Sequence, residues 1–207
     1  MSGPQCCENA PSLSSSSGAG HVEEIGGLQS YVTGPADSKI AVLLVSDVFG
    51  YEAPKLRKLA DKVAGAGIFV VVPDFFFGDP LVLEKTTVDD WLKNHGPDQG
   101  FEHAKPVIEA LKGKGITKVG AAGFCWGGVK VPISILGAEK DQKWPPELLK
   151  KFGEALDAKP EVDGFVKIFP GATHGWTVRY KDEDEKEVKA AAEAHQDTLD
   201  WFVKYLK

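Results

Sequence analysis

The sequence contains few cysteines and no long apolar segment. Three cysteines in 207 residues, two of them adjacent at Cys6 and Cys7, are too few for a disulfide scaffold. No stretch approaches the roughly 18 consecutive apolar residues of a transmembrane helix. Residues 1–20 lack the basic and apolar regions of a secretory signal and are rich in Ser, Gly and Pro. We therefore expect a flexible arm at residues 1–20 and a cytoplasmic protein.

Positive charge is also scarce. The chain has 24 Lys and Arg against 30 Asp and Glu, for a formal net charge of -6. This balance argues against nucleic acid or an anionic membrane as a partner. The hydrophobic content of 43% suffices for one core, so we expect a single domain over residues 21–207, as a monomer or weak dimer.

Apolar runs alternate with helical periodicity along most of the chain. Residues 22–25 and 28–32 flank Gly26-Gly27, which is a hairpin signal. Short apolar runs predict further strands, and apolar residues at helical spacing predict helices between them. The strands are expected at 40–45, 68–72, 118–122, 131–136 and 165–169, and the helices at 56–63, 86–94, 101–111, 148–156 and 188–206. The alternation predicts an α/β fold, a three-layer sandwich with a mostly parallel sheet. The sequence has no P-loop, no dinucleotide glycine fingerprint and no cysteine-histidine cluster with zinc spacing.

The run Gly123-Phe124-Cys125-Trp126-Gly127-Gly128 directly follows the apolar run that ends at Ala122. A glycine two residues before and two after a nucleophile, behind a strand, is typical of the nucleophile elbow of α/β-hydrolases. Cysteine occupies the nucleophile position here. The pattern therefore predicts that Cys125 attacks a carbonyl carbon.

A cysteine nucleophile needs a base, a group that orients the base, and hydrogen-bond donors for the oxyanion. In this fold the acid and then the histidine follow later strands. Asp141 comes after the strand predicted at 131–136, and His174 comes after the one at 165–169. We expect His174 to act as the base and Asp141 to orient it. The backbone N–H groups of Trp126 and Val48 are the expected oxyanion donors.

The chain resembles the dienelactone hydrolase family, and within it the plant cytosolic members, which often carry an endo-1,3;1,4-β-D-glucanase label. The matching pieces span roughly residues 20–207 and are Ser46 to Gly50, Val72 to Asp74, Gly123 to Gly128, Gly137 with Asp141, and Gly171 with His174. The resemblance implies hydrolysis of small esters or lactones through a thioester, with no metal and no cofactor. It also implies that Asp47 contacts the resting thiol. Arg179 is a candidate for binding a substrate carboxylate, and Trp176 is a candidate pocket residue.

The chain departs from the family pattern directly after the elbow. A parallel crossover needs about a dozen residues and a βαβ unit roughly 30, yet the strand predicted at 131–136 follows Gly128 almost at once. About 30 residues, a helix and a strand, are therefore missing from the pattern. The open explanations are a shortened isoform or gene model, which we favour, an omitted stretch with closed-up numbering, and a rearranged connection.

Other interpretations of the same residues stay open. His174 could be a capped loop histidine, Asp141 a turn residue, and Cys125 an inert buried cysteine. His195 falls on the apolar stripe of the last helix and is expected in the core. Two alternative functions compete with the esterase: an impaired relative that acts as a binding protein, and an endo-β-glucanase, which needs two carboxylates flanking a sugar.

Overall fold

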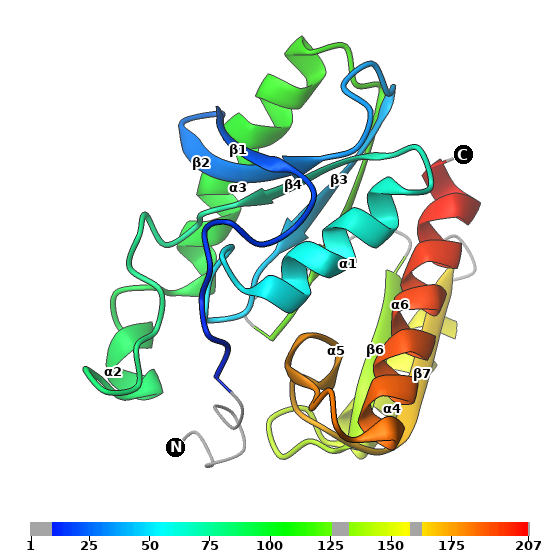
Figure 1. Cartoon of the computed structure of the whole chain (residues 1–207). Coiled ribbons are helices and arrows are strands. Elements are labelled where there is room, and N and C mark those ends of the chain that lie inside the picture. Colours follow the sequence, from blue (N-terminus) through cyan, green and yellow to red (C-terminus); the bar gives the residue numbers. More distant parts are fainter. Residues whose placement is uncertain (1–9, 126–132, 158–162, 207) are drawn as a thin grey trace. The chain divides into compact units, whose positions relative to one another are not determined.

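A computed structural model describes residues 10–125, 133–157 and 163–206. The chain divides between Gly128 and Val129 into two compact units (Figure 1). We call the described residues 10–125 the N-terminal unit and the described residues from 133 to 205 the C-terminal unit. The elbow cysteine belongs to the first unit, and the predicted acid and histidine belong to the second.

The N-terminal unit is built on a mixed five-stranded sheet in the order β1-β2-β4-β3-β5. The first two strands form an antiparallel hairpin, and β3, β4 and β5 run parallel to one another. The central strands are covered on both faces, so side chains that point to either face are buried. This agrees with their continuous apolar runs. The bounds are β1 (His21–Ile25), β2 (Leu28–Thr33), β3 (Ile40–Val45), β4 (Phe69–Pro73) and β5 (Lys118–Gly123).

Helices cover both faces of this sheet, with α1 and α3 on opposite sides in Figure 1. Helix α1 (Pro54–Ala64) begins with proline, whose fixed φ suits the first helical position, and buries an apolar stripe that includes Leu56 and Val63. Helix α2 (Val88–Leu92) is short and is capped by the Thr87 side chain. Helix α3 (Pro97–Gly113) continues through the internal Pro106. These elements agree with the predicted α/β alternation.

The C-terminal unit contains a two-stranded parallel sheet of β6 (Ile133–Lys140) and β7 (Gly164–Thr173). Its helices are α4 (Pro146–Asp157), α5 (Trp176–Arg179) and α6 (Glu185–Leu206). Helix α4 packs closely on β6 at Gly137, which has no side chain. A Cβ at this position would lie 2.0 Å from Leu149 Cδ1. A small core joins β6, β7, α5 and α6 through Ala138, Phe169, Ala172, Trp176 and Ala194.

The described part of the predicted arm, residues 10–20, packs on the rest of the N-terminal unit. Buried Arg57 donates hydrogen bonds from Nη1 to the carbonyl oxygens of Ser15 and Ser17, at 2.8 and 3.2 Å. The Ala19 N–H donates to the Asp61 carboxylate at 2.9 Å. Among the described helices, none is long and apolar enough to cross a membrane.

The β1–β2 turn supplies a matched pair of substitutions. Gly26 and Gly27 both have positive φ, at 60° and 84°. A Cβ at Gly26 would lie 2.5 Å from the backbone of Pro106 and Val107 on α3, whereas a Cβ at Gly27 would have no neighbour within 4 Å. We expect Gly27→Ala to lower the free energy of unfolding by about 1 kcal/mol through left-handed strain alone. Gly26→Ala adds a backbone clash and should cost about 2–4 kcal/mol.

Urea denaturation of both variants and the wild type measures these costs. Equal destabilisation by the two substitutions would contradict the close packing of α3 on the hairpin.

Candidate active site

The predicted base and acid come together because of the register of β6 and β7. In this parallel pair Lys140 is opposite Thr173, and these are the last residues of the two strands. The next residues along each strand are Asp141 and His174. Their side chains meet at a distance of 2.7 Å between His174 Nδ1 and Asp141 Oδ2. Both side chains are buried, so water competes little for this contact.

Asp141 is held by more than the histidine. Its Oδ1 atom accepts hydrogen bonds from the backbone N–H groups of Lys143 at 2.8 Å and Trp144 at 3.1 Å. Burial alone would raise the pKa of Asp141, but the hydrogen bond from His174 and the two N–H groups together hold this pKa below its ordinary value. The carboxylate is thus fixed and ionised, which suits a group that orients an imidazole through Nδ1.

Arg179 and Trp176 lie on α5, directly after His174. Trp176 packs on Phe169 with ring centroids 5.3 Å apart and is 8% exposed, within the core of the C-terminal unit. The Arg179 guanidinium is buried against Gly175, where a Cβ would lie 2.0 Å from Nη2. Gly175 has a left-handed φ of 80°. The predicted core position of His195 agrees with its 9% exposure and its 2.7 Å hydrogen bond through Nε2 to the Thr177 carbonyl oxygen.

The thiol belongs to the N-terminal unit and follows β5. Cys125 has φ 57°, a left-handed conformation that is uncommon for a residue with a side chain. The Phe124 N–H donates to the Val45 carbonyl oxygen at 3.1 Å. This hydrogen bond ties the start of the turn after β5 to the last residue of β3. A strained turn that presents a nucleophile after a strand is the geometry of the elbow. The predicted oxyanion donor Trp126 lies outside the described residues.

Asp47 and Val48 follow β3, the strand beside β5. Both are buried, at 3% exposure each. Asp47 Oδ1 accepts a hydrogen bond from the Phe49 N–H at 3.0 Å, which fixes the carboxylate within the turn. The Val48 carbonyl oxygen accepts the Leu81 N–H at 2.8 Å. The carboxyl ends of β3 and β5 are level, because Val45 is opposite Gly123, so these two residues and Cys125 start from the same edge of the sheet.

Sequence reasoning missed two features of the structure. The backbone donors at residues 143 and 144 follow from the turn after Asp141, which an Asx-type turn signal could have indicated. A second feature lies outside this site, as a pocket beside the segment Phe75–Phe77. From the sequence these aromatic residues could line a pocket, but a core position is favoured. 

A comparison with protein families identifies the family of this chain. The family model described as "Dienelactone hydrolase family" matches residues 28–129 and 128–206. The chain belongs to the dienelactone hydrolase family. The two matches meet at residues 128–129, the place where the sequence pattern departs from an uninterrupted elbow, helix and strand.

Curated relatives of this dienelactone hydrolase family member include a plant protein and several animal proteins. It is 41% identical over 194 residues to a Zea mays protein named endo-1,3;1,4-beta-D-glucanase. This alignment covers 76% of this chain and 63% of the maize protein. It is 30% identical over 224 residues to a carboxymethylenebutenolidase homolog of Xenopus tropicalis, covering 90% of this chain and 91% of the frog protein. This chain therefore spans less than two thirds of the maize relative's length.

The frog alignment is longer than this chain. Since 90% of 207 residues is about 186, about 38 of the 224 aligned positions have no residue in this chain. The same count for the maize alignment gives about 37, because 76% of 207 residues is about 157 of 194 positions. Both values agree with the predicted absence of about 30 residues.

Solved structures support the fold. A dienelactone hydrolase-like promiscuous phosphotriesterase from metagenomic libraries matches with a TM-score of 0.62 and 16% identity, covering 90% of this chain and 97% of that one. An esterase of Thermogutta terrifontis matches with a TM-score of 0.55 and 14% identity, covering 87% and 94%. The family model and these neighbours confirm the predicted α/β-hydrolase class.

The hydrogen-bonded carboxylate of Asp141 predicts a defined pH dependence. Its native pKa lies below the ordinary value of 3.8, so its contribution to stability is complete well above pH 3.8 and is lost as the pH falls below 3.8 through the native pKa. Asp141→Asn should lower the free energy of unfolding by about 1–3 kcal/mol at pH 7. This difference from the wild type should shrink as the pH falls below 3.8.

Urea denaturation from pH 7 to pH 3 tests this expectation. The exposed Asp157 on α4 supplies a control, since Asp157→Asn should change stability little at any of these pH values. A wild-type to Asp141→Asn difference that stayed constant down to pH 3 would contradict the assigned role of the carboxylate.

Proposed function

We propose that this protein hydrolyses small carboxylic esters or lactones through a triad of Cys125, His174 and Asp141. The observation that carries the proposal is the buried 2.7 Å contact between His174 Nδ1 and Asp141 Oδ2, which directs the other ring nitrogen, Nε2, away from the carboxylate. The left-handed elbow at Cys125 supports it from the other unit. The family to which the chain belongs supports the reaction class.

In the proposed reaction His174 takes the proton of the Cys125 thiol, and the thiolate sulfur attacks the carbonyl carbon of the ester. The tetrahedral intermediate carries its negative charge on oxygen, and the N–H groups of Val48 and Trp126 are the proposed donors to it. The C–O bond to the alcohol breaks, and the alcohol leaves with the proton from His174. Water then adds to the thioester with His174 as base, which releases the acid and returns the proton to sulfur.

Asp47 is the proposed contact of the resting thiol. It starts two residues past the sheet row of Val45 and Gly123, as Cys125 does, and its carboxylate is buried and oriented by the Phe49 N–H. Arg179 and Trp176 are the proposed substrate-binding residues of the C-terminal unit. Their positions two and five residues after His174, at the same end of β7, support this role.

The family pattern is interrupted near residue 128, and from this interruption we infer how active the chain is. A helix that begins behind a cysteine places its positive dipole end at the sulfur, and it stabilises both a thiolate and an oxyanion. The aligned relatives contain about 38 positions that this chain lacks. We infer that these positions follow the elbow, where the two family matches meet, and that the present chain is a weaker catalyst than its full-length relatives.

A glucanase is the second candidate, because the maize relative carries that name. A glycosidase uses two carboxylates that flank a sugar, about 5–10 Å apart. In the C-terminal unit the Asp141 carboxylate is committed to His174 and to two backbone donors. That arrangement supports the orientation of an imidazole better than it supports either role in a glycosidase pair.

Replacing the thiol separates these candidates. We expect Cys125→Ala to abolish hydrolysis of p-nitrophenyl acetate above the buffer rate, and iodoacetamide to inactivate the wild type in proportion to alkylation of Cys125. His174→Ala should lower kcat/KM by about 10²–10⁴-fold, because it removes the general base. The control is Cys6→Ala with Cys7→Ala, which removes the other two thiols.

Ester hydrolysis that survives Cys125→Ala would overturn the cysteine mechanism. Release of reducing sugar from a mixed-linkage glucan by the alkylated protein would favour the glucanase instead. A protein without either activity would correspond to the impaired relative that acts by binding.

Supplying the absent segment tests the inferred interruption. Insertion of the corresponding residues of the maize relative between Gly128 and Val129 should raise the esterase kcat/KM by about tenfold or more, since a helix dipole contributes up to about 2 kcal/mol in a partly buried site. A glycine-serine insertion of equal length is the matched control. Equal rates for the two insertions would contradict the proposed role of the segment.

A further inference from the structure

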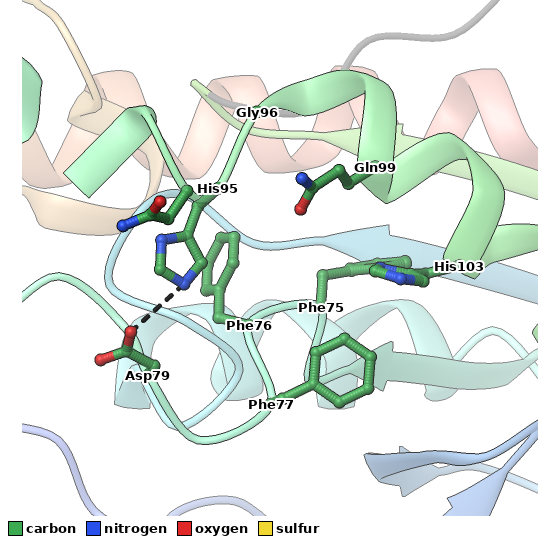
Figure 2. Close-up of a pocket in the computed structure, with 9 residues that line it drawn as sticks. Phe75, Phe76, Phe77, Asp79, His95, Gly96, Gln99 and His103 are labelled. Atoms are coloured by element: carbon green, nitrogen blue, oxygen red, sulfur yellow. Dashed lines mark ion pairs between the residues drawn. The ribbon is translucent and has the colours of Figure 1, made fainter. Parts of the chain in front are cut away.

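The N-terminal unit contains a pocket outside the triad. It lies between the segment after β4 and the start of α3, and its volume is about 280 Å³. Ligand pockets usually measure roughly 300–1,000 Å³, so this one suits a single small ring. Figure 2 shows the pair His95 and Asp79 at one end of the pocket, His103 at the other, and Gln99 between them.

One wall of the pocket is fixed in advance. His95 stacks on Trp91 with ring centroids 4.2 Å apart and an interplanar angle of 6°, and the Phe76 ring lies nearly perpendicular to both. The Trp91 indole N–H donates to the Asp79 carbonyl oxygen at 3.0 Å. His95 Nε2 lies 3.3 Å from the Asp79 carboxylate. A wall that is locked before binding lowers the entropy cost of holding a ligand.

Phe77 supplies an exposed aromatic ring at the same pocket. Its φ of 53° is unusual for a residue with a side chain, and the residue is 64% exposed. The turn is held by buried Asp74, whose carboxylate accepts hydrogen bonds from the backbone N–H groups of Phe76 and Gly78. Strained residues of this kind persist where the surrounding structure enforces them, and they concentrate at ligand sites.

The polar groups of the pocket surround its aromatic part. The His103 ring lies 4.9 Å from Phe77, edge to face, and its Nδ1 atom is buried with no hydrogen-bond partner among the described residues. Exposed amide side chains at Asn94 and Gln99 line the pocket between the two ends. The described lining includes neither Lys nor Arg. This lining disfavours an anionic ligand and suits one that carries hydrogen-bonding groups on several sides of a ring.

We propose that this pocket binds a single pyranose ring, with its apolar face against Phe77 and its hydroxyl groups toward Gln99 and His103. A pyranose has hydroxyls around its whole edge, and its C–H face packs on aromatic rings. An aromatic ring with one polar substituent would leave most of these donors and acceptors without partners, at a cost in affinity.

The sheet register places this pocket near the proposed nucleophile. Val71, Leu43 and Ala121 are aligned across β4, β3 and β5, so Phe75 and Cys125 each lie four residues past the same row. Two strand spacings of about 4.8 Å separate β4 from β5 at this edge. The sugar would thus be the alcohol part of an acylated-sugar ester, and this part of the inference rests on the proposed function.

Binding is tested without catalysis, in the full chain carrying Cys125→Ala. We expect methyl β-D-glucopyranoside to bind saturably with a millimolar Kd in a saturation-transfer NMR titration. Phe77→Ala and Gln99→Ala, each added to this background, should weaken binding about fivefold or more, because each removes one contact of the ring. Phe152→Ala, at an exposed phenylalanine of α4 in the other unit, is the matched control and should leave Kd unchanged.

The outcomes separate this inference from the proposed function. Absence of saturable glucoside binding, or binding unaffected by both pocket substitutions, overturns the pocket assignment even if the wild type hydrolyses esters. Saturable binding of benzyl alcohol in place of the glucoside overturns the sugar assignment. Glucoside binding that follows the expected pattern supports the pocket even if Cys125 proves to have no esterase role.

Discussion

Parallel strand register is the constraint on which both halves of the candidate site depend. A parallel ladder fixes neighbouring strands so that their carboxyl ends fall at one edge, and residues one step beyond paired positions become neighbours. In the C-terminal unit the Lys140–Thr173 pair makes Asp141 and His174 such neighbours. In the N-terminal unit Asp47 and Cys125 each lie two residues past the paired Val45 and Gly123, so both begin from the same edge of the sheet.

In the candidate site, backbone strain and hydrogen bonding fix different residues. Cys125 is held in a left-handed turn at the end of β5, and the Phe124 N–H ties that turn to β3. The carboxylate of Asp141 is held instead by donors, which offset the cost of its burial. Backbone strain thus holds the proposed nucleophile, and hydrogen bonds immobilise the proposed orienting carboxylate.

The sequence predicted most of the helices and strands, because apolar runs and turn residues act locally. The run Ile40–Val45 is a strand with the predicted bounds, and the Gly26-Gly27 turn joins β1 to β2. The strands β6 and β7 extend four residues beyond the expected ends, to Lys140 and Thr173. Their last residues are polar or small, so hydropathy does not reveal them, whereas the ladder between the strands retains them.

Other features could not be read from the chain because they depend on contacts between distant segments. Arg57 donates to residues about 40 positions earlier, and no local pattern announces that a Ser-rich segment will meet a buried guanidinium. The pairing of His95 with Asp79 likewise joins the segment after α2 to the segment after β4, although the stacking of His95 on Trp91 is a local contact four residues apart. The sequence does not mark His95, Trp91 or Asp79 as unusual. Only their contacts in the folded chain give the pocket a fixed wall.

The interruption near residue 128 links the fold to the expected activity. Three boundaries coincide there: the family match divides, the two compact units divide, and the β5 strand of one sheet precedes the β6 strand of another. A βαβ unit places a crossover helix and the next strand between such neighbours, and about 38 aligned positions of the frog relative have no residue in this chain. A two-stranded sheet is marginal by itself, so β6 and β7 depend on α4, α6 and the small core around Phe169. The dyad therefore rests on a scaffold with its own packing, and the ordering of Asp141 and His174 does not require the segment that the elbow lacks.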